Sequence, residues 1–599
     1  MSTNNQRFDY VVVGGGTAGL VIASRLTEDS KIRVLVVEAG SDRRSDPLIL
    51  TPGLVAAVRG KDEYDWKFSS VPQASLNSRR VPQTRGKMLG GSSALNYMML
   101  LYPSRGIIDA WQALGNDGWG FDSLAPYYRK FTTVHAPPQA ARDVVGLTYR
   151  DESIESGDGP IQVSYSEGYG VTNGAWLKSF SELGLEASTD PRHGNAVGAF
   201  QNPATIDPAT KTRSYAATGY YNANVAARPN LVVMTDSLVS RILFNTTQTE
   251  PVATGVEIVD KDGKKTEVFV SSEVILAAGA LQSPQILELS GIGGSELLQK
   301  HGIPVLVDNP NVGENMHDHP IVCQSFEVND GVPSADRLRD PQVLQALMQM
   351  YQTKAAGPLG QSNLTGAFTP LVDSSGVLSP AATESLFSAH ASSSPGNDLV
   401  LSLLKSSSTP ALQFLLFPTQ VNIPQDSSPP PSQPENFITV MTALSHPFSR
   451  GSVHITSGDV SVLPAWDPQY NSHPLDLDIL AHGVQFVERI ISPSLPFGQL
   501  LKPNGKRLPP LTPSPEPDDL ETAREIVRQQ QISMFHVSGS CAMLPREKGG
   551  VVDSRLRVYG TKGLRVVDAS VFPLEPSGNI QSTVYAVAER AADLIRGVV

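Results

Sequence analysis

The hydrophobic pattern at the start of the chain predicts a strand, a helix and a second strand in quick succession. Residues 8–13 (FDYVVV) are a short apolar run rich in β-branched residues, which is typical of a buried strand. Residues 18–28 carry apolar side chains at helical spacing, and residues 32–37 (IRVLVV) are a second apolar run that ends at Glu38. A strand–helix–strand unit of this length predicts a parallel sheet.

Similar elements return in the middle and at the end of the chain. Residues 231–234 and 273–277 have the composition of strands, and residues 281–289 have a helical pattern. Residues 564–567 predict another strand, and residues 580–597 predict a closing helix. The first domain is therefore expected to draw on both ends of the chain and on a middle piece.

The remaining sequence has a different character and predicts a second lobe. Residues 372–435 are rich in serine and proline, and we expect exposed loops at 426–434 and 509–517. Residues 437–443 and 452–455 alternate between apolar and polar positions, as strands with one buried face do. This pattern predicts an α+β lobe with a mixed or antiparallel sheet.

Charge excludes two classes of partner. The chain has 599 residues, with 47 lysines and arginines against 59 aspartates and glutamates, which gives a formal net charge of −12. Nucleic-acid binding needs a basic face, and attraction to an anionic membrane surface needs basic clusters. We therefore expect neither nucleic acid nor a membrane as a partner.

The cysteines and the N-terminus bear on cofactor class and location. Cys323 and Cys541 are the only two cysteines, and no C-x-x-C pair exists, so zinc ribbons and thioredoxin-type motifs are excluded. The first residues lack the features of a signal peptide, and no apolar run reaches 18 residues. We expect a cytoplasmic or otherwise intracellular protein, either a monomer or a homodimer.

A glycine motif between the first strand and the first helix predicts a dinucleotide site. Gly14 allows a tight turn, Gly16 lets the backbone approach a pyrophosphate, and Gly19 lets helix and sheet pack closely. Glu38 follows the second strand, 19 residues after Gly19, where an acid bonds a ribose hydroxyl. A carboxylate there disfavours NADP, but these residues leave NAD and FAD both open.

Longer motifs resolve this choice, because they resemble a known family. Residues 86–96 (GKMLGGSSALN) and 279–293 (GALQSPQILELSGIG) closely resemble two signature stretches of the glucose-methanol-choline (GMC) oxidoreductases. Residues 536–596 also resemble that family, from HVSGSCAM to the final helix. The resemblance covers nearly the whole chain, is weakest over 330–435, and is closest to fungal members of the aryl-alcohol oxidase kind.

The resemblance implies bound FAD and a division into two domains. The FAD-binding domain, Rossmann-like and discontinuous, would comprise 6–105, 225–318 and 550–599, and the substrate-binding domain would comprise 106–224 and 319–549. Family position assigns cofactor contacts to Gly14, Gly16, Thr17, Ala18, Gly19, Glu38, Ala39, Gly90, Gly91, Ser92, Asn96, Tyr97, Met98, Val239, Asp568, Ala569, Asn579, Ile580 and Gln581.

Some of these assignments carry a specific expectation. Asn96 can offer a donor and an acceptor to the flavin edge. Val239 matches a backbone contact to adenine, and Asp568 and Ala569 match positions near the pyrophosphate and ribityl chain. Leu95 stands where some family members carry a histidine bonded covalently to the flavin, so the resemblance implies non-covalent FAD.

The catalytic pair is also assigned by resemblance. The family has a histidine in an H-x-x-G stretch and a second histidine or asparagine about forty residues later. His536 and Asn579 fit these positions, 43 residues apart. A neutral imidazole can take the proton of an alcohol near neutral pH, and an amide can stabilise the developing negative charge on the oxygen. Asparagine does not titrate, so His536 is the expected base.

Two aromatic residues and one histidine-rich stretch are weaker candidates. Tyr97 and Phe535 resemble the aromatic gate of aryl-alcohol oxidases and are candidate substrate contacts, although ordinary packing explains them equally well. The His317–Asp318–His319 stretch offers two ligands on one side of a strand, but it resembles a structural stretch of the family. We therefore expect no metal site. No G-x-S-x-G is present, so a hydrolase is not supported.

The predicted function is FAD-dependent oxidation of a primary or secondary alcohol, aromatic or otherwise bulky, by hydride transfer to flavin N5. The electrons would then pass to O₂ or to a quinone-like acceptor, and the sequence does not distinguish the two. An alternative is an FAD-retaining lyase or cyclase of secondary metabolism without net redox change. A flavoprotein without catalysis is disfavoured, because both members of the pair are present.

Overall fold

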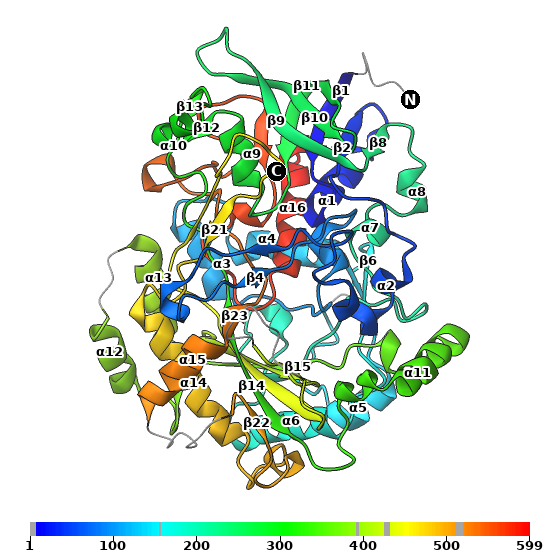
Figure 1. Cartoon of the computed structure of the whole chain (residues 1–599), viewed down its shortest axis with the longest axis vertical. Coiled ribbons are helices and arrows are strands. Elements are labelled where there is room, and N and C mark those ends of the chain that lie inside the picture. Colours follow the sequence, from blue (N-terminus) through cyan, green and yellow to red (C-terminus); the bar gives the residue numbers. More distant parts are fainter. Residues whose placement is uncertain (1–6, 155–156, 391–393, 424–431, 511–518) are drawn as a thin grey trace.

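A computed structural model describes residues 7–154, 157–390, 394–423, 432–510 and 519–599. Most of the two predicted loops, 426–434 and 509–517, lies outside the described residues. Two large sheets occupy opposite ends of the molecule, one beside both chain termini and one at the far end (Figure 1).

The first sheet contains the predicted N-terminal strands at its centre. Its order is β8-β2-β1-β11-β10-β9, and β24 pairs with β11 off this path. The middle and C-terminal runs thus join the N-terminal unit in one sheet, as predicted. The strands are β1 Arg7–Val13, β2 Val34–Val37, β8 Leu231–Met234, β9 Ser237–Asn245, β10 Val252–Asp260, β11 Lys265–Leu276 and β24 Leu564–Val566.

The parallel prediction holds for only part of this sheet. Neighbours among β8, β2, β1, β11 and β24 are parallel, but β10 pairs antiparallel with both β9 and β11. The connections 246–251 and 261–264 are too short for a crossover helix, so consecutive strands can only turn back on themselves. The sheet is therefore mixed.

Three helices from distant parts of the chain pack together beside this sheet. The glycine turn leads into α1 (Thr17–Leu26), which packs on the closing helix α16 (Gln581–Arg596), and α16 packs in turn on α4 (Phe121–Lys130). Because strands and α16 cover it from different sides, α1 is buried nearly all round, not along the single face that its spacing predicts.

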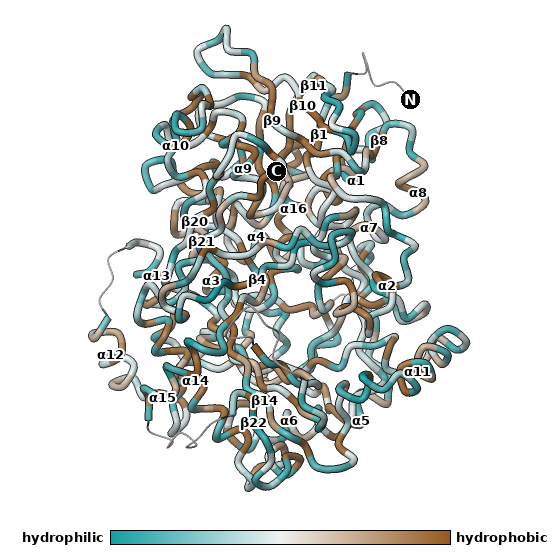
Figure 2. Tube along the Cα trace, viewed as in Figure 1, coloured by the Kyte–Doolittle hydropathy of each residue, from teal (hydrophilic) through white to brown (hydrophobic). Residues whose placement is uncertain are grey.

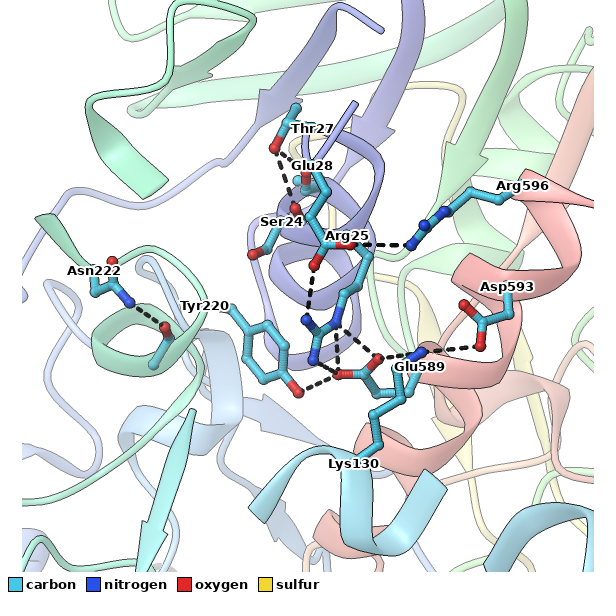
Figure 3. Close-up of polar contacts among 12 residues, drawn as sticks. Ser24, Arg25, Thr27, Glu28, Lys130, Tyr220, Asn222, Glu589, Asp593 and Arg596 are labelled. Carbon is cyan, nitrogen blue, oxygen red and sulfur yellow. Dashed lines mark hydrogen bonds and ion pairs between the residues drawn. The ribbon is translucent and has the colours of Figure 1, made fainter. Parts of the chain in front are cut away.

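A buried carboxylate joins these three helices (Figure 3). Glu589 on α16 has no exposed side-chain surface and accepts hydrogen bonds from Arg25 Nε at 2.9 Å and from the Tyr220 hydroxyl at 2.6 Å. Arg25 comes from α1, and Lys130, whose Nζ lies 3.3 Å from Glu589, comes from α4. The closing helix is therefore tied electrostatically to the start of the chain.

The second sheet is antiparallel throughout, in agreement with the predicted second lobe. Its order is β22-β14-β19-β18-β15-β7, with β23 paired to β14. The predicted strand at 437–443 is β19 in its centre. The strands are β7 Gly198–Gln201, β14 Pro320–Glu327, β15 Thr365–Thr369, β18 Leu412–Phe417, β19 Phe437–Leu444, β22 Arg507–Leu508 and β23 Gln531–Ser533.

The other predicted strand of this lobe lies elsewhere. Residues 452–455 form β20 (Ser452–His454), which pairs with β21 (Ala465–Asp467) in a separate two-stranded sheet. This ribbon packs on α9 (Ser283–Leu289) beside the first sheet, where Glu288 hydrogen-bonds the ring of His454 at 2.7 Å. Alternation predicted a strand here but carried no information about its partner.

Helices cover the second sheet, and hydropathy follows the layers. α14 (Pro474–Ile490) packs on β19, and α15 (Leu520–Gln530) packs on α14 and β14. Hydrophobic positions follow strands such as β9 and β14, while α15 is largely hydrophilic on the outside (Figure 2).

Among the described residues, no helix combines the length and apolar content that a membrane crossing needs. Further helices include α2 Pro47–Leu50, α3 Arg105–Ala113, α5 Gln139–Val145, α6 Val171–Glu182, α7 Ala216–Gly219, α8 Ala223–Ala226, α10 Ser295–Lys300, α11 Pro341–Lys354, α12 Pro380–Ser388 and α13 Pro395–Leu404.

Candidate active site

The predicted glycine turn joins β1 to α1 and is sterically closed to larger residues. Gly14 has a φ of +101°, and a Cβ on it would lie 2.5 Å from the carbonyl oxygen of Ala277. A Cβ on Gly19 would lie 2.0 Å from the Gly14 carbonyl oxygen, so Gly19 packs helix against turn as expected. Gly16, Thr17 and Ala18, at the N-terminus of α1, line a cavity, and a helix N-terminus favours an anion.

The second glycine segment closes against the first. Gly90 and Gly91 both have positive φ, +92° and +51°. A Cβ on Gly91 would lie 2.9 Å from the Cα of Gly16, so the two backbones touch. Gly90 instead faces the ring of Tyr215, and it does not line the cavity. Gly16 and Gly91 line the cavity, and Gly90 supports the turn behind them.

Glu38 occupies the predicted ribose position at the end of β2. Its Oε2 accepts the backbone N–H of Gly15 and its Oε1 that of Gly40, both at 2.8 Å. Burial raises the pKa of Glu38 to about 7, against the lowering effect of those two N–H donors. The carboxylate is thus fixed beside the phosphate turn and faces the cavity.

A single cavity connects Glu38 to His536, and most predicted site residues line it. Gly19 and Gly90 are the predicted residues that do not. The sequence reasoning missed Trp66, Arg85 and Met99, which also line it. The predicted residues on its wall are Gly14, Gly16, Thr17, Ala18, Glu38, Ala39, Gly91, Ser92, Asn96, Tyr97, Met98, Val239, Phe535, His536, Asp568, Ala569, Asn579, Ile580 and Gln581.

Asp568 joins the C-terminal motif to the 279–293 stretch. Its Oδ2 accepts the backbone N–H of Gly279 at 2.9 Å and the hydroxyl of Ser283 at 2.6 Å. Its Oδ1 accepts the N–H of Ser570 at 2.8 Å. Because its oxygens are occupied by the protein, Asp568 shapes the wall near the predicted pyrophosphate position by holding the Gly279 turn in place.

Asn96 plays a similar joining role. Its Oδ1 accepts the N–H of Met98 and a guanidinium N–H of the buried Arg213, both at 3.0 Å, and its Nδ2 donates to the side chain of Gln581. Both lone pairs of the Asn96 Oδ1 and one of its two Nδ2 N–H groups are therefore used within the protein. Asn96 connects the first flavin motif to the beginning of α16.

The predicted catalytic pair meets on the wall of this cavity. Asn579 Nδ2 lies 3.2 Å from His536 Nε2, and both residues line the cavity. Asn579 Oδ1 has no hydrogen-bond partner within the described chain. Burial lowers the pKa of His536 well below its usual value, so its imidazole is neutral near neutral pH. The chain thus presents a neutral imidazole and an amide side by side.

The histidine-rich stretch supports this pair from behind. Asp318 Oδ1 accepts the backbone N–H of His536 at 2.8 Å, and its Oδ2 accepts the Ser533 hydroxyl at 2.5 Å. His319 Nδ1 lies 2.8 Å from His536 Nδ1. Within the described residues, no group of three His, Cys, Asp or Glu side chains could hold a metal ion. These contacts span more than 200 positions, so local sequence patterns could not reveal them.

Aromatic side chains line part of the cavity. Trp66, Tyr97 and Phe535 line it, and Tyr97 meets Phe417 edge-on with ring centroids 5.3 Å apart. The guanidinium of Arg59 lies over both predicted gate rings, 4.6 Å from the Tyr97 centroid and 4.7 Å from that of Phe535. The two aromatic residues are thus brought together beside one guanidinium, and their role as a gate stays a prediction.

Together, a discontinuous dinucleotide-binding domain, a second lobe and a histidine–asparagine pair on the wall of one cavity define a flavin-type oxidoreductase. The GMC oxidoreductase models match residues 8–321 and 447–588. The chain belongs to the GMC oxidoreductase family, as its motifs predicted, and is an FAD oxidoreductase that acts on alcohols or similar compounds.

Known proteins resemble the chain along its whole length. The dehydrogenase citC of Monascus ruber is 36% identical, with 98% of this chain and 96% of citC covered. An FAD-dependent oxidoreductase from Chaetomium thermophilum superimposes with a TM-score of 0.85 at 31% identity, and 99% of each chain is covered. A fungal aryl-alcohol oxidase gives a TM-score of 0.82 at 28% identity, again over 99% of each chain.

Proposed function

We propose that this enzyme oxidises a primary or secondary alcohol that carries an aromatic or bulky group, with His536 as the base. The observation that carries the proposal is the neutral imidazole of His536 beside the amide of Asn579 on the cavity wall. The cavity then continues to Glu38, so cofactor and substrate would share it end to end.

The described residues fit FAD. Gly16 and Gly91 present bare backbone on the cavity wall, which lets a pyrophosphate approach closely, and Glu38 lines the same cavity as the expected ribose ligand. Bound FAD supplies the hydride acceptor, and the protein supplies position and electrostatics. The residue boundaries of the FAD-binding and substrate-binding domains given above are part of this proposal, as are the individual cofactor contacts.

Leu95 supports non-covalent attachment. It is 2% exposed and aliphatic, so the position that matches the covalent histidine offers no nucleophile. We expect acid precipitation to release the flavin into the supernatant, where its absorbance is measured. Flavin that stays with the protein pellet after washing would contradict this.

The chain's own residues divide the proton chemistry between them. An alcohol hydroxyl held by the Asn579 amide lies within reach of His536 Nε2, which accepts its proton as hydride leaves the adjacent carbon. Asn579 also stabilises the negative charge that develops on the oxygen. The acceptor of the electrons, O₂ or a quinone-like compound, remains a prediction, as do an intracellular location and a monomeric or homodimeric state.

The aromatic lining supports a bulky planar substrate. Trp66, Tyr97, Met99 and Phe535 present apolar surface to the cavity that His536 also lines, and aromatic rings stack well on one another. A small aliphatic alcohol would leave much of this surface without contacts. We therefore expect aryl alcohols to give higher kcat/KM than short aliphatic ones.

An anaerobic substrate panel tests the proposal directly. Aryl, aliphatic and sugar alcohols are mixed with the enzyme without oxygen, and bleaching of the flavin band is followed. The proposal expects bleaching by an aryl alcohol, and H₂O₂ on readmission of air if the acceptor is O₂. Product formation without bleaching would support the lyase or cyclase alternative, and a flavin that no alcohol bleaches would contradict the proposal.

A further inference from the structure

We propose that His319 is the positioning residue that holds His536 in the tautomer whose Nε2 is unprotonated and faces the cavity. The proposal rests on the function proposed above, because it explains how His536 is ready to act as a base. It starts from an unusual contact, in which two histidine rings meet through the same type of nitrogen.

The rings of His319 and His536 meet edge to face. Their Nδ1 atoms are 2.8 Å apart, the ring planes are 81° apart, and the two residues are 1% and 7% exposed. A hydrogen bond of this length needs one proton between the two nitrogens. The other contacts of His319 determine which ring carries this proton.

The backbone fixes the tautomer of His319. Its Nε2 lies 3.0 Å from the carbonyl oxygen of Ser445, and a carbonyl can only accept a hydrogen bond. Nε2 must therefore carry the proton, because two lone pairs would otherwise face each other in a buried site. A neutral His319 then has a bare Nδ1, which can only accept.

The tautomer of His536 follows from that of His319. Since His319 Nδ1 accepts, His536 Nδ1 must donate, and a neutral His536 has its lone pair on Nε2. Nε2 faces the Asn579 amide at 3.2 Å on the cavity wall, where a donor N–H satisfies it until a substrate hydroxyl arrives. When Nε2 takes a proton, the Nδ1 hydrogen bond to His319 stays as it was.

The charges around the two rings support neutral forms. Glu575 Oε1 lies 3.8 Å from His319 Nδ1, too far for a hydrogen bond, and burial raises the pKa of Glu575 well above its usual range. Burial and the neighbouring His446 lower the pKa of His319 to about 3. His319 is therefore not an imidazolium, which would reverse the direction of the bond.

The charged groups near His536 also favour its neutral form. Burial lowers the pKa of His536 most, and the neighbouring His319 and the cation Arg85 lower it further. Asp318 touches His536 only at its backbone N–H, not at its ring. A neutral His536 is thus expected across the working pH range, and which nitrogen is bare, rather than its charge, decides whether it can act.

Two substitutions of similar shape isolate the role of the His319 acceptor. Asparagine and leucine both branch at Cγ, so His319→Asn places an amide oxygen where Nδ1 stands, and His319→Leu places a methyl group there. Both lose the hydrogen bond to Ser445, so this effect cancels between them. Asparagine at position 319 can accept the Nδ1–H of His536, but leucine cannot. In His319→Leu we therefore expect the proton of His536 to move from Nδ1 to Nε2.

The first measurement is the limiting rate of anaerobic flavin reduction by an alcohol that reduces the wild type. We expect His319→Leu to be slower than His319→Asn by about 10²-fold or more, the usual worth of a general base. The deficit should persist as pH rises, since a neutral but wrongly protonated ring is not corrected by added base. Equal rates in the two variants, or recovery of His319→Leu at high pH, would overturn the proposal.

The second measurement needs no substrate, so it separates this proposal from the proposed function. Nitrogen NMR of FAD-loaded protein labelled at histidine nitrogens reports which ring nitrogen is bare, and His536→Asn assigns the signal. We expect a bare Nε2 on His536 in the wild type and in His319→Asn, and a protonated Nε2 in His319→Leu. A protonated Nε2 in the wild type would overturn the proposal even if alcohols bleach the flavin.

Discussion

His536 is a single side chain on which the proposed chemistry depends, and its loss should separate catalysis from cofactor binding. His536→Ala removes the ring nitrogen that meets Asn579 at the cavity, so we expect flavin reduction by alcohol to slow by about 10²–10⁴-fold. FAD should stay bound, because the glycine turn and Glu38 are untouched. Stopped-flow bleaching and the ratio of flavin to protein absorbance measure the two effects.

The matched control is His482→Ala on α14, a histidine that does not line the cavity. It should reduce at the wild-type rate with the same flavin content. A His536→Ala enzyme that reduces as fast as this control would remove His536 from the mechanism. A His536→Ala enzyme without flavin would instead show that the residue has a structural role.

At the scale of elements, the Glu589 cluster should act as one cooperative unit. Glu589 has no exposed side-chain surface and Arg25 is 20% exposed, so removing one partner leaves a largely buried charge unpaired. We expect Glu589→Gln to lower the free energy of unfolding by about 3 kcal/mol, near the lower end of such losses because Arg25 and Lys130 retain some solvent. Denaturant titration measures this.

A double-mutant cycle identifies the cause of that loss. Arg25→Leu with Glu589→Leu should cost less than the sum of the two single changes, because the pair is removed together. Additive losses would mean that Glu589 stabilises α16 through its other contacts and not through Arg25. Surface Glu296→Ala on α10, away from this cluster, should leave the free energy of unfolding within about 0.5 kcal/mol of the wild type.

The ribbon of β20 and β21 is held to α9 by a contact that depends on pH. His454 lies between Glu288 at 2.7 Å and Glu314 at 3.0 Å. Burial opposes its charge, but the hydrogen bonds to the two glutamates outweigh burial and raise the pKa of His454 to about 9. A raised pKa in the folded state contributes stability below the ordinary value of about 6.5, and this is lost as pH rises through about 9.

The comparison variant for this contact is His454→Gln. The difference in free energy of unfolding between wild type and variant should be largest below about pH 6.5 and should shrink toward pH 9. Other groups titrate in the same range, and the difference between the two proteins cancels them. A difference that does not change with pH would show that His454 acts by packing alone.

At the scale of the whole molecule, what the sequence reveals depends on how far apart the interacting residues lie. The β1–α1–β2 unit was predictable because its periodicity is local, and His536 with Asn579 because their motifs are long. The antiparallel β9 and β10 were missed, since pairing direction is set by connection length and not by the apolar pattern. The contact between His319 and His536 was missed, because the two residues lie 217 positions apart.

Cofactor binding should stabilise the whole chain, because the cavity wall draws on segments from both ends and the middle of the sequence. A ligand that binds only the folded state stabilises it by RT ln(1 + [L]/Kd), so free FAD at about 100 times its Kd should add about 2.7 kcal/mol. Protein stripped of flavin and titrated with FAD should therefore show an unfolding temperature that rises with the FAD concentration.

In Glu38→Ala the same FAD concentrations should raise the unfolding temperature less, since the proposed ribose contact is gone, whereas Glu296→Ala should follow the wild type. An undiminished rise in Glu38→Ala would exclude Glu38 from the cofactor site and leave the glycine turn alone to hold the nucleotide.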